Sequence, residues 1–180
     1  MTNQMHREKL KILSFLLQFP DDRMIADLSK VRGQIEAAFD ESDRVKVGGL
    51  LRHLQETPLL ELQENFSGLF DLNPATCLNL TYYQYGDDKK RGQALARCAQ
   101  AYTEAGFSID HLELPDYLPM VLELASEAKN GDTQWMLVAN QSVIAALAER
   151  MAEAGSPYAG LFEILAQLLV MLETKTKREA

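Results

Sequence analysis

The chain has 180 residues, of which 47% are hydrophobic and 24% charged, a composition that excludes wholesale disorder and is ordinary for a globular protein. Its 26 acidic residues against 18 basic ones give a net charge of −8, which argues against nucleic acid or an anionic membrane surface as a partner. The same charge would attract a basic peptide, although its simpler role is to keep a helical protein soluble. A chain of this length suits one hydrophobic core, and we expect a single domain over residues 1–180.

Cysteine usage and apolar segments indicate the compartment. Cys77 and Cys98 form no CxxC motif and have no zinc-type spacing with histidine, and the lack of a disulfide framework suits a reducing compartment. The apolar run Ile12–Leu17 is short and has no A-x-A site after it, so it favours an amphipathic first helix over a signal peptide. Leu168–Leu172 is far too short to span a bilayer. We therefore expect a cytoplasmic protein without direct membrane insertion.

Helix signals dominate from one end of the chain to the other. Apolar residues recur with the spacing of one helix face, for example at Leu118, Val121, Leu122 and Ala125, and no segment alternates for long like a half-buried strand. This periodicity predicts, in chain order, helices at about 4–19, 22–39, 42–56, 58–70, 75–85, 88–105, 116–130, 132–154 and 157–176. Because the connections are short, the expected fold is all-α, a single-domain helical bundle of about eight or nine helices.

Glycines mark several of the expected helix ends. Gly86, Gly106, Gly131 and Gly155 each close a helix-like run, where a residue with positive φ is favoured just after the C-cap. Ser156–Pro157 then reads as an N-cap followed by proline at the first helical position, where a missing N–H is harmless.

Two prolines constrain the stretch that follows Phe107. Pro115 and Pro119 cannot both lie inside one regular helix. If Asp116 is the N-cap, Pro119 falls in the first turn, where no intrahelical N–H bond is due, and the Asp116 carboxylate accepts from the Leu118 N–H. The sequence therefore predicts a helix capped by Asp116.

Glu113 lies before this cap, where no local rule requires a carboxylate. Together with Asp110, it places acidic groups beside Leu112, Leu114 and Tyr117. A stiff, acidic and apolar corner suits capture of a basic, hydrophobic peptide, in which arginine pairs with carboxylate through two N–H donors. The alternative, which spacing alone favours, is that the apolar side chains dock the loop on the core while Glu113 is solvated.

A tyrosine-rich run at residues 80–92 is the second informative stretch. Three of its side chains offer rigid contact area with polar tips, which suits an interface, although tyrosines at helical spacing belong more often to a core: Tyr82, Tyr83 and Tyr85. Asp87 and Asp88 fall where the next helix begins, and either could cap it. The basic residues at 89–91 oppose the dipole of that helix, which hints at an ion pair with acids nearby, although a solvated face is the default.

Catalytic signatures are missing from the sequence. His6, His53 and His111 have no mutual spacing for a metal, and no G-x-S-x-G, phosphate loop or H-E-x-x-H occurs. Glu113 and Asp116 could form an acid–base pair, but nothing in the sequence supplies a nucleophile or a phosphate cradle. We expect no enzyme, no metal and no cofactor of the chain's own.

Five ordered blocks carry a resemblance to a known family: NFSGLFD at 65–71, LTYYxYGD at 80–87, RGxAL at 91–95, AGF at 105–107 and ELPDYLP at 113–119. They closely resemble the NarJ-type nitrate reductase delta chain, within the wider TorD/DmsD-type redox-enzyme maturation chaperones. The blocks span about the middle third of the chain, and the last one is quite specific.

The resemblance implies an all-α, system-specific chaperone and not a subunit of the finished enzyme. Such a chaperone would bind the N-terminal peptide of the catalytic (alpha) subunit of a nitrate reductase-like molybdoenzyme, assist molybdenum cofactor insertion and delay membrane docking. Cofactor-biosynthesis proteins are further implied partners. Carried over by position, the peptide-binding candidates are Glu113, Pro115, Asp116 and Tyr117, with Tyr82, Tyr83, Tyr85 and Asp87 as further candidates near the groove. The sequence pattern leaves open a non-catalytic helical adaptor or structural subunit of another complex.

Overall fold

The computed structural model describes the backbone of residues 2–109, 113–128 and 133–179, and the side chains of residues 4–109, 113–128 and 133–173. Within these residues every regular element is helical, which confirms the predicted all-α fold. The elements are α1 (Thr2–Leu16), α2 (Asp22–Ala38), α3 (Glu41–Glu56), α4 (Leu59–Phe66), η1 (Ser67–Asp71), α5 (Tyr82–Tyr85), α6 (Arg91–Glu104), α7 (Leu118–Glu127), α8 (Trp135–Ala139), α9 (Gln141–Glu153) and α10 (Ala159–Glu179). η1 is a π-helical turn that continues α4 directly.

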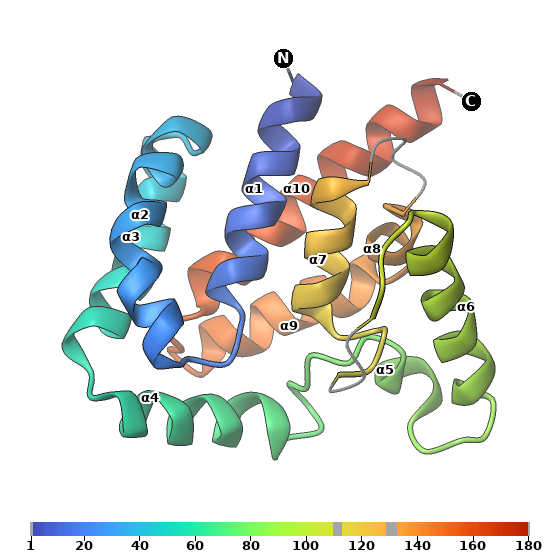
Figure 1. The fold of residues 1–180 in the computed structure, drawn as a ribbon, viewed down its shortest axis with the longest axis horizontal. Coiled ribbons are helices and arrows are strands. Elements are labelled where there is room, and N and C mark those ends of the chain that lie inside the picture. Colours follow the sequence, from blue (N-terminus) through green and yellow to red (C-terminus); the bar gives the residue numbers. More distant parts are fainter. Residues whose placement is uncertain (1, 110–112, 129–132, 180) are drawn as a thin grey trace.

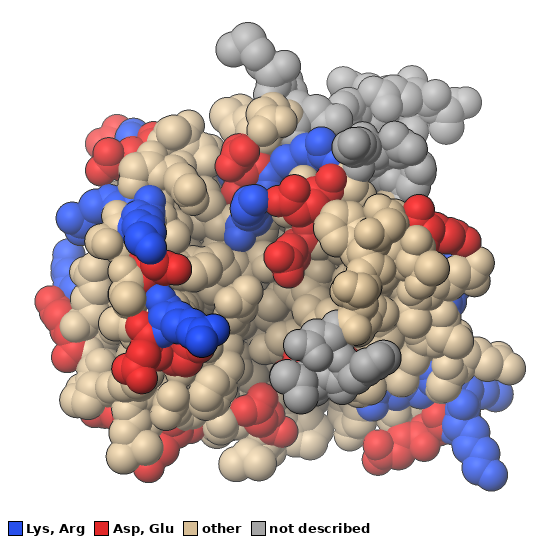
Figure 2. All heavy atoms as spheres, in the orientation of Figure 1, with Lys and Arg blue, Asp and Glu red and all other residues tan. Residues whose placement is uncertain are grey.

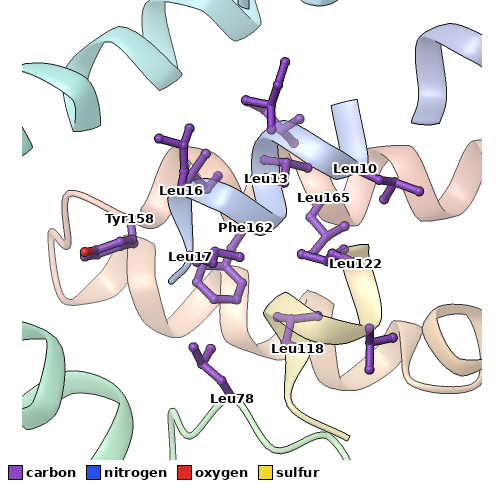
Figure 3. Close-up of a cluster of buried hydrophobic side chains, with 14 of the residues drawn as sticks. Leu10, Leu13, Leu16, Leu17, Leu78, Leu118, Leu122, Tyr158, Phe162 and Leu165 are labelled. Atoms are coloured by element: carbon purple, nitrogen blue, oxygen red, sulfur yellow. The ribbon is translucent and has the colours of Figure 1, made fainter. Parts of the chain in front are cut away.

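The long helices form a bundle around one apolar cluster. α1 packs against α7 and α2, α9 packs against α10, and α3 lies on both α2 and α10 (Figure 1). Figure 3 shows side chains of α1, α7 and α10 meeting at the centre, among them the fully buried Leu13 and Phe162. Each such side chain contributes roughly 1.5–3 kcal/mol through burial. None of the described helices is long and apolar enough to cross a membrane.

Helix ends follow local chemistry in most places. Asp21 caps α2 by accepting from the Met24 N–H at 2.7 Å, and Asp40 caps α3 by accepting from the Asp43 N–H at 2.9 Å. The second of these bonds lowers the pKa of the Asp40 carboxyl. The expected positive φ is present at three glycines and confirmed there: Gly86, Gly106 and Gly155. Gly131 lies outside the described residues.

The start of the last helix differs slightly from the expectation. The Ser156 hydroxyl accepts from the Tyr158 N–H at 3.2 Å, and α10 begins at Ala159 rather than at Pro157.

Two predicted helices are wrong in extent. The segment expected to be helical over 75–85 is helical only in α5, because Asn73 and Thr76 bind nearby backbone groups with their side chains and the chain then runs extended to meet another segment. The helix expected over 132–154 is divided into α8 and α9. Asn140 separates them and donates its side-chain amide to the Met136 carbonyl at 2.7 Å.

Candidate peptide-binding site

Two segments far apart in sequence pair just before α7. The Leu80 N–H donates to the Asp116 carbonyl at 3.1 Å, and the Leu118 N–H donates to the Leu78 carbonyl at 2.8 Å. Asn79 and Tyr117 form an antiparallel bridge between these bonds. We call residues 77–81 and 113–118 the paired segments. Leu78 and Leu118 anchor them by pointing into the core, as Figure 3 shows, so the paired segments have a fixed position on the bundle.

The Asp116 carboxylate clamps the paired segments together. Its side chain is 1% exposed. One oxygen accepts from the Asn79 amide at 3.1 Å, and the other accepts from the Thr81 N–H at 2.9 Å and the Thr81 hydroxyl at 2.5 Å. The predicted N-cap role of Asp116 is therefore wrong. The N-cap position belongs to Tyr117, and the Leu118 N–H that Asp116 was expected to bind is taken by the other segment.

Arg91, one of the three basic residues at 89–91 that oppose the dipole of α6, has an acidic partner. Its guanidinium lies 3.5 Å from an Asp116 oxygen and donates from Nε to the Thr81 hydroxyl at 3.0 Å. It also lies over the Tyr82 ring, 5.4 Å from the centroid. A positive charge at the N-terminus of α6 is unfavourable, but Arg91 also supplies a partner for the buried Asp116 carboxylate, and this pairing offsets the cost. The hinted ion pair exists, but its acid comes from 25 residues further along the chain and not from Asp87 or Asp88.

A hollow of about 260 Å³ lies on one side of the paired segments, between them and the α4–η1 junction. We call it the acidic pocket, because the carboxylates of Asp71 and Glu113 both line it beside the rings of Phe19, Phe70 and Tyr117. Neither carboxylate forms an ion pair with another described residue. Burial, and then the charge of Asp71, raises the pKa of Glu113. Two unpaired carboxylates next to aromatic faces suit a guanidinium or ammonium group.

The π-helical turn shapes one wall of this pocket. In η1 the Leu72 N–H donates to the Ser67 carbonyl at 2.9 Å, so the chain winds more widely than an α-helix before it leaves at Asp71. In α4, the Gln63 amide donates to the Pro20 carbonyl at 2.9 Å and holds the loop after α1. Phe19, 44% exposed, is thereby kept at the rim and packs edge-on to Phe66.

A second hollow, of about 390 Å³, lies on the other side of the paired segments, against α6 and α8. We call it the apolar pocket, since Leu80, Trp135 and Met136 are among the residues that line it. Arg97 lies over the Trp135 ring at its edge, 4.4 Å from the centroid. Burial raises the pKa of Cys98, which also lines this pocket, to about 11, so the thiol stays protonated and behaves as a small hydrophobe.

The structure divides the predicted site residues between these pockets. Glu113 and Tyr117 line the acidic pocket, whereas Asp116 and Tyr85 line the apolar pocket. Neither Asp110 nor Leu112, which the sequence placed beside Glu113, lies within the described residues.

The other four predicted residues line neither of these two pockets. Tyr82 lies under Arg91, and the Tyr83 hydroxyl donates to the Cys77 carbonyl at 2.8 Å, which secures the start of the first paired segment. Pro115 is partly buried and Asp87 is exposed. Sequence reasoning missed most of the residues that line the pockets, among them Phe19, Asp71, Arg97 and Trp135. For Asp71 there was a signal, because it ends the first of the five family blocks.

Comparisons with known proteins identify the fold and the family of this chain. The fold is shared with a crystal structure of a putative redox enzyme maturation protein from Archaeoglobus fulgidus, which superposes with a TM-score of 0.63 over 91% of this chain and 93% of that chain, at 21% identity. The family described as nitrate reductase delta subunit matches residues 36–163. The chain belongs to this family, which confirms the resemblance.

Two curated relatives match nearly the whole chain. The nitrate reductase molybdenum cofactor assembly chaperone NarJ of Escherichia coli (strain K12) is 31% identical over 162 residues, which cover 89% of this chain and 69% of that protein. The probable nitrate reductase molybdenum cofactor assembly chaperone NarJ of Bacillus subtilis (strain 168) is 32% identical over 172 residues, covering 93% of this chain and 90% of that protein. Both names describe assembly chaperones and no catalytic activity.

Proposed function

We propose that this chain is a non-catalytic, cytoplasmic assembly chaperone for a nitrate reductase-like molybdoenzyme. It binds the N-terminal peptide of the catalytic (alpha) subunit, keeps that subunit competent for molybdenum cofactor insertion and delays its docking on the membrane partner. Family membership and the names of the relatives support the chaperone role. The acidic pocket is the observation that carries the peptide-binding part of the proposal. The unpaired carboxylates of Asp71 and Glu113, which both belong to the family blocks, lie beside aromatic rings there.

Within this proposal a basic side chain of the peptide enters the acidic pocket. Asp71 and Glu113 accept hydrogen bonds from its N–H groups. The rings of Tyr117 and Phe19 contact the planar guanidinium of an arginine or the aliphatic chain of a lysine. Leu114, 42% exposed and adjacent to Glu113, offers apolar surface to the neighbouring turn of the peptide. Buried apolar area supplies most of the affinity, at about 25 cal/mol per Å² less the ordering costs, while the carboxylates select a basic partner.

Asp116 has a different role in this proposal. Its oxygens are occupied by Asn79, Thr81 and Arg91, so it fixes the paired segments between the two pockets and does not pair with a basic side chain of the peptide. The apolar pocket takes an apolar side chain of the same peptide, with Tyr85 on its wall. Tyr82, Tyr83 and Pro115 hold or belong to the paired segments, whereas Asp87 is exposed, lines neither pocket and has no role in this proposal.

Neutralising either pocket carboxylate should weaken peptide binding. Glu113→Gln and Asp71→Asn keep side-chain size, and each is expected to raise the Kd for a synthetic N-terminal peptide of the catalytic subunit about tenfold, roughly 1.4 kcal/mol, because one charge-assisted hydrogen bond is lost. Isothermal titration calorimetry measures this directly. Asp87→Asn removes an equal charge at an exposed residue outside both pockets and should leave Kd unchanged. Wild type that gives no binding heat, or variants that bind like wild type, would refute the proposed site.

The raised pKa of Glu113 gives this binding a pH dependence. Since the carboxyl loses its charge at a higher pH than an ordinary glutamate, affinity for the basic peptide should fall as pH is lowered through that pKa, and the Glu113→Gln curve should be flatter. Folding has the opposite sign. A folded-state pKa above the unfolded one means that the folded state holds the proton more tightly, so this group favours folding as pH falls. Glu113→Gln should therefore lose affinity at neutral pH without losing stability, as calorimetry and urea melts at matched pH would measure.

A chaperone also differs from the alternative, an adaptor or structural subunit, in which form of the enzyme it remains bound to. The chaperone should copurify with the apo catalytic subunit and be absent from the finished, membrane-docked enzyme. A fixed ratio to the catalytic subunit in the purified holoenzyme would instead favour a structural subunit.

A further inference from the structure

Arg97 has no acidic partner among the described residues, in a chain whose net charge is −8. Near the start of α6, basic side chains lie next to acidic ones, as the lower right of Figure 2 shows. Arg97 lies more than one turn beyond Arg91, the first residue of this helix, and it forms neither an ion pair nor a hydrogen bond with a described residue. The Asp116 carboxylate lines the same pocket as Arg97, but it is already paired with Arg91. The charge of Arg97 is therefore available to a ligand.

Contact with Trp135 restricts the Arg97 side chain without using its hydrogen-bond donors. The guanidinium lies 4.4 Å from the centroid of the Trp135 ring, which belongs to the first residue of α8. A guanidinium carries its N–H donors in a planar fork that matches both oxygens of a carboxylate. None of these donors binds a described residue. Because the ring contact already orders the side chain, pairing with a carboxylate would cost less conformational entropy than at a free surface arginine.

The apolar pocket beside Arg97 indicates what should accompany that carboxylate. Its volume of about 390 Å³ lies in the range of small ligand sites. Leu80 and Met136 line it together with Gln84 and Gln93, whose side-chain amides form no hydrogen bond with a described residue. The pocket therefore fits an apolar side chain that has a carboxylate next to it, and the two amides can bond to backbone groups of the same segment.

The two pockets beside the paired segments differ in the sign of their unpaired charge. The acidic pocket has the carboxylates of Asp71 and Glu113, whereas the apolar pocket has the guanidinium of Arg97. A ligand that reaches both pockets should therefore be basic at one end and acidic at the other. In the reverse direction it would bring like charges together at both ends, which disfavours that orientation.

We propose that Arg97 binds an acidic residue of the catalytic subunit's N-terminal peptide, and that this contact sets the direction in which the peptide lies across the paired segments. The inference rests on the proposed function, in which a basic residue of the same peptide enters the acidic pocket. The acidic residue is a neighbour of the apolar side chain that enters the apolar pocket. Arg97 is thus a specificity-determining residue of the site.

A second set of calorimetric titrations tests the pairing. Arg97→Gln should raise the Kd of a synthetic N-terminal peptide about fivefold, the upper range for an exposed ion pair. This loss should vanish when one particular aspartate or glutamate of the peptide has been replaced by its amide. Arg97→Lys keeps the charge but not the planar fork, so it should recover only part of the affinity. Lys90→Gln, the matched control, removes an equal charge at an exposed residue outside both pockets and should leave Kd unchanged.

Trp135 provides an independent readout, because it is the only tryptophan in the chain and it lines the apolar pocket. A peptide whose own tryptophans have been replaced by phenylalanine should change the emission of Trp135 as it binds. Arg97→Gln should melt within about 3 °C of wild type, since it loses one ring contact of an exposed side chain.

The outcomes separate this inference from the proposed function. A peptide that binds with dependence on Glu113, but whose Kd is the same for Arg97→Gln, overturns the inference and leaves the proposed function in place. So does an Arg97→Gln loss that is equal for every acidic-to-amide peptide, a bound peptide without acidic residues, or binding that leaves Trp135 emission unchanged. Wild type without binding heat contradicts the proposed function itself.

Discussion

Asp116→Ala is expected to lower the free energy of unfolding by about 3–5 kcal/mol, the usual cost of removing one partner of a buried ion pair. The substitution leaves the Thr81 N–H, the Asn79 amide and the Arg91 guanidinium without the acceptor that they share, a carboxylate whose side chain is 1% exposed. The paired segments would then separate more easily, although Leu78 and Leu118 remain in the core. Urea denaturation followed by circular dichroism measures the loss.

Asp87→Ala is the matched control, since this aspartate is exposed and its replacement should change stability by less than about 0.5 kcal/mol. Peptide affinity of the Asp116→Ala variant should fall together with its stability, because the carboxylate acts through the paired segments. A variant that unfolds like wild type yet has lost the peptide would show instead that Asp116 contacts the ligand directly.

Phe70→Ala is expected to cost a similar amount, about 3–5 kcal/mol, for a different reason. The ring is 2% exposed and packs edge-on against Phe66 and Tyr158, with centroid separations of 4.8 and 5.2 Å. Removing it opens a cavity in the core and also deepens the acidic pocket, whose floor it forms. Thermal and urea unfolding should both show the loss.

Leu72→Ala is the control for this variant, because Leu72 lies two residues away in the same turn but is 80% exposed. It should unfold within about 0.5 kcal/mol of wild type. If Phe70→Ala were as stable as Leu72→Ala, the aromatic cluster beneath the acidic pocket would not have the packing described above.

Periodicity was sufficient to predict the bundle. The apolar stripe beginning at Leu118 forms the buried face of α7, and glycines with positive φ end helices at residues 86, 106 and 155. Local rules work there because a helix is stabilised by contacts and dihedral angles close in sequence. Glu113 and Tyr117 became candidates through the acidic, apolar character of their segment and the family resemblance, and the structure places both in the acidic pocket.

Long-range pairing is what the sequence could not reveal. Asp116 has the residue type and the position typical of an N-cap. Only because residues 77–81 pack against its segment does its carboxylate bind Thr81, 35 residues away in the sequence. The predicted helix over 75–85 failed for the same reason, because its backbone bonds are made to the other segment. Asp71 reaches the acidic pocket through a π-helical turn, and no periodicity argument distinguishes such a turn from the end of an α-helix.

The central claim is that the acidic pocket holds a basic side chain of the client peptide, and a double-mutant cycle tests it most directly. Glu113→Gln is combined in turn with replacement of each arginine or lysine of the peptide by glutamine, and Kd is measured by calorimetry for all four corners of each cycle. One peptide residue should show a coupling of about 1–3 kcal/mol with Glu113, because the second substitution costs little once the first has removed the pair. Additive effects at every basic residue of the peptide would contradict the claim, since no basic side chain would then depend on Glu113.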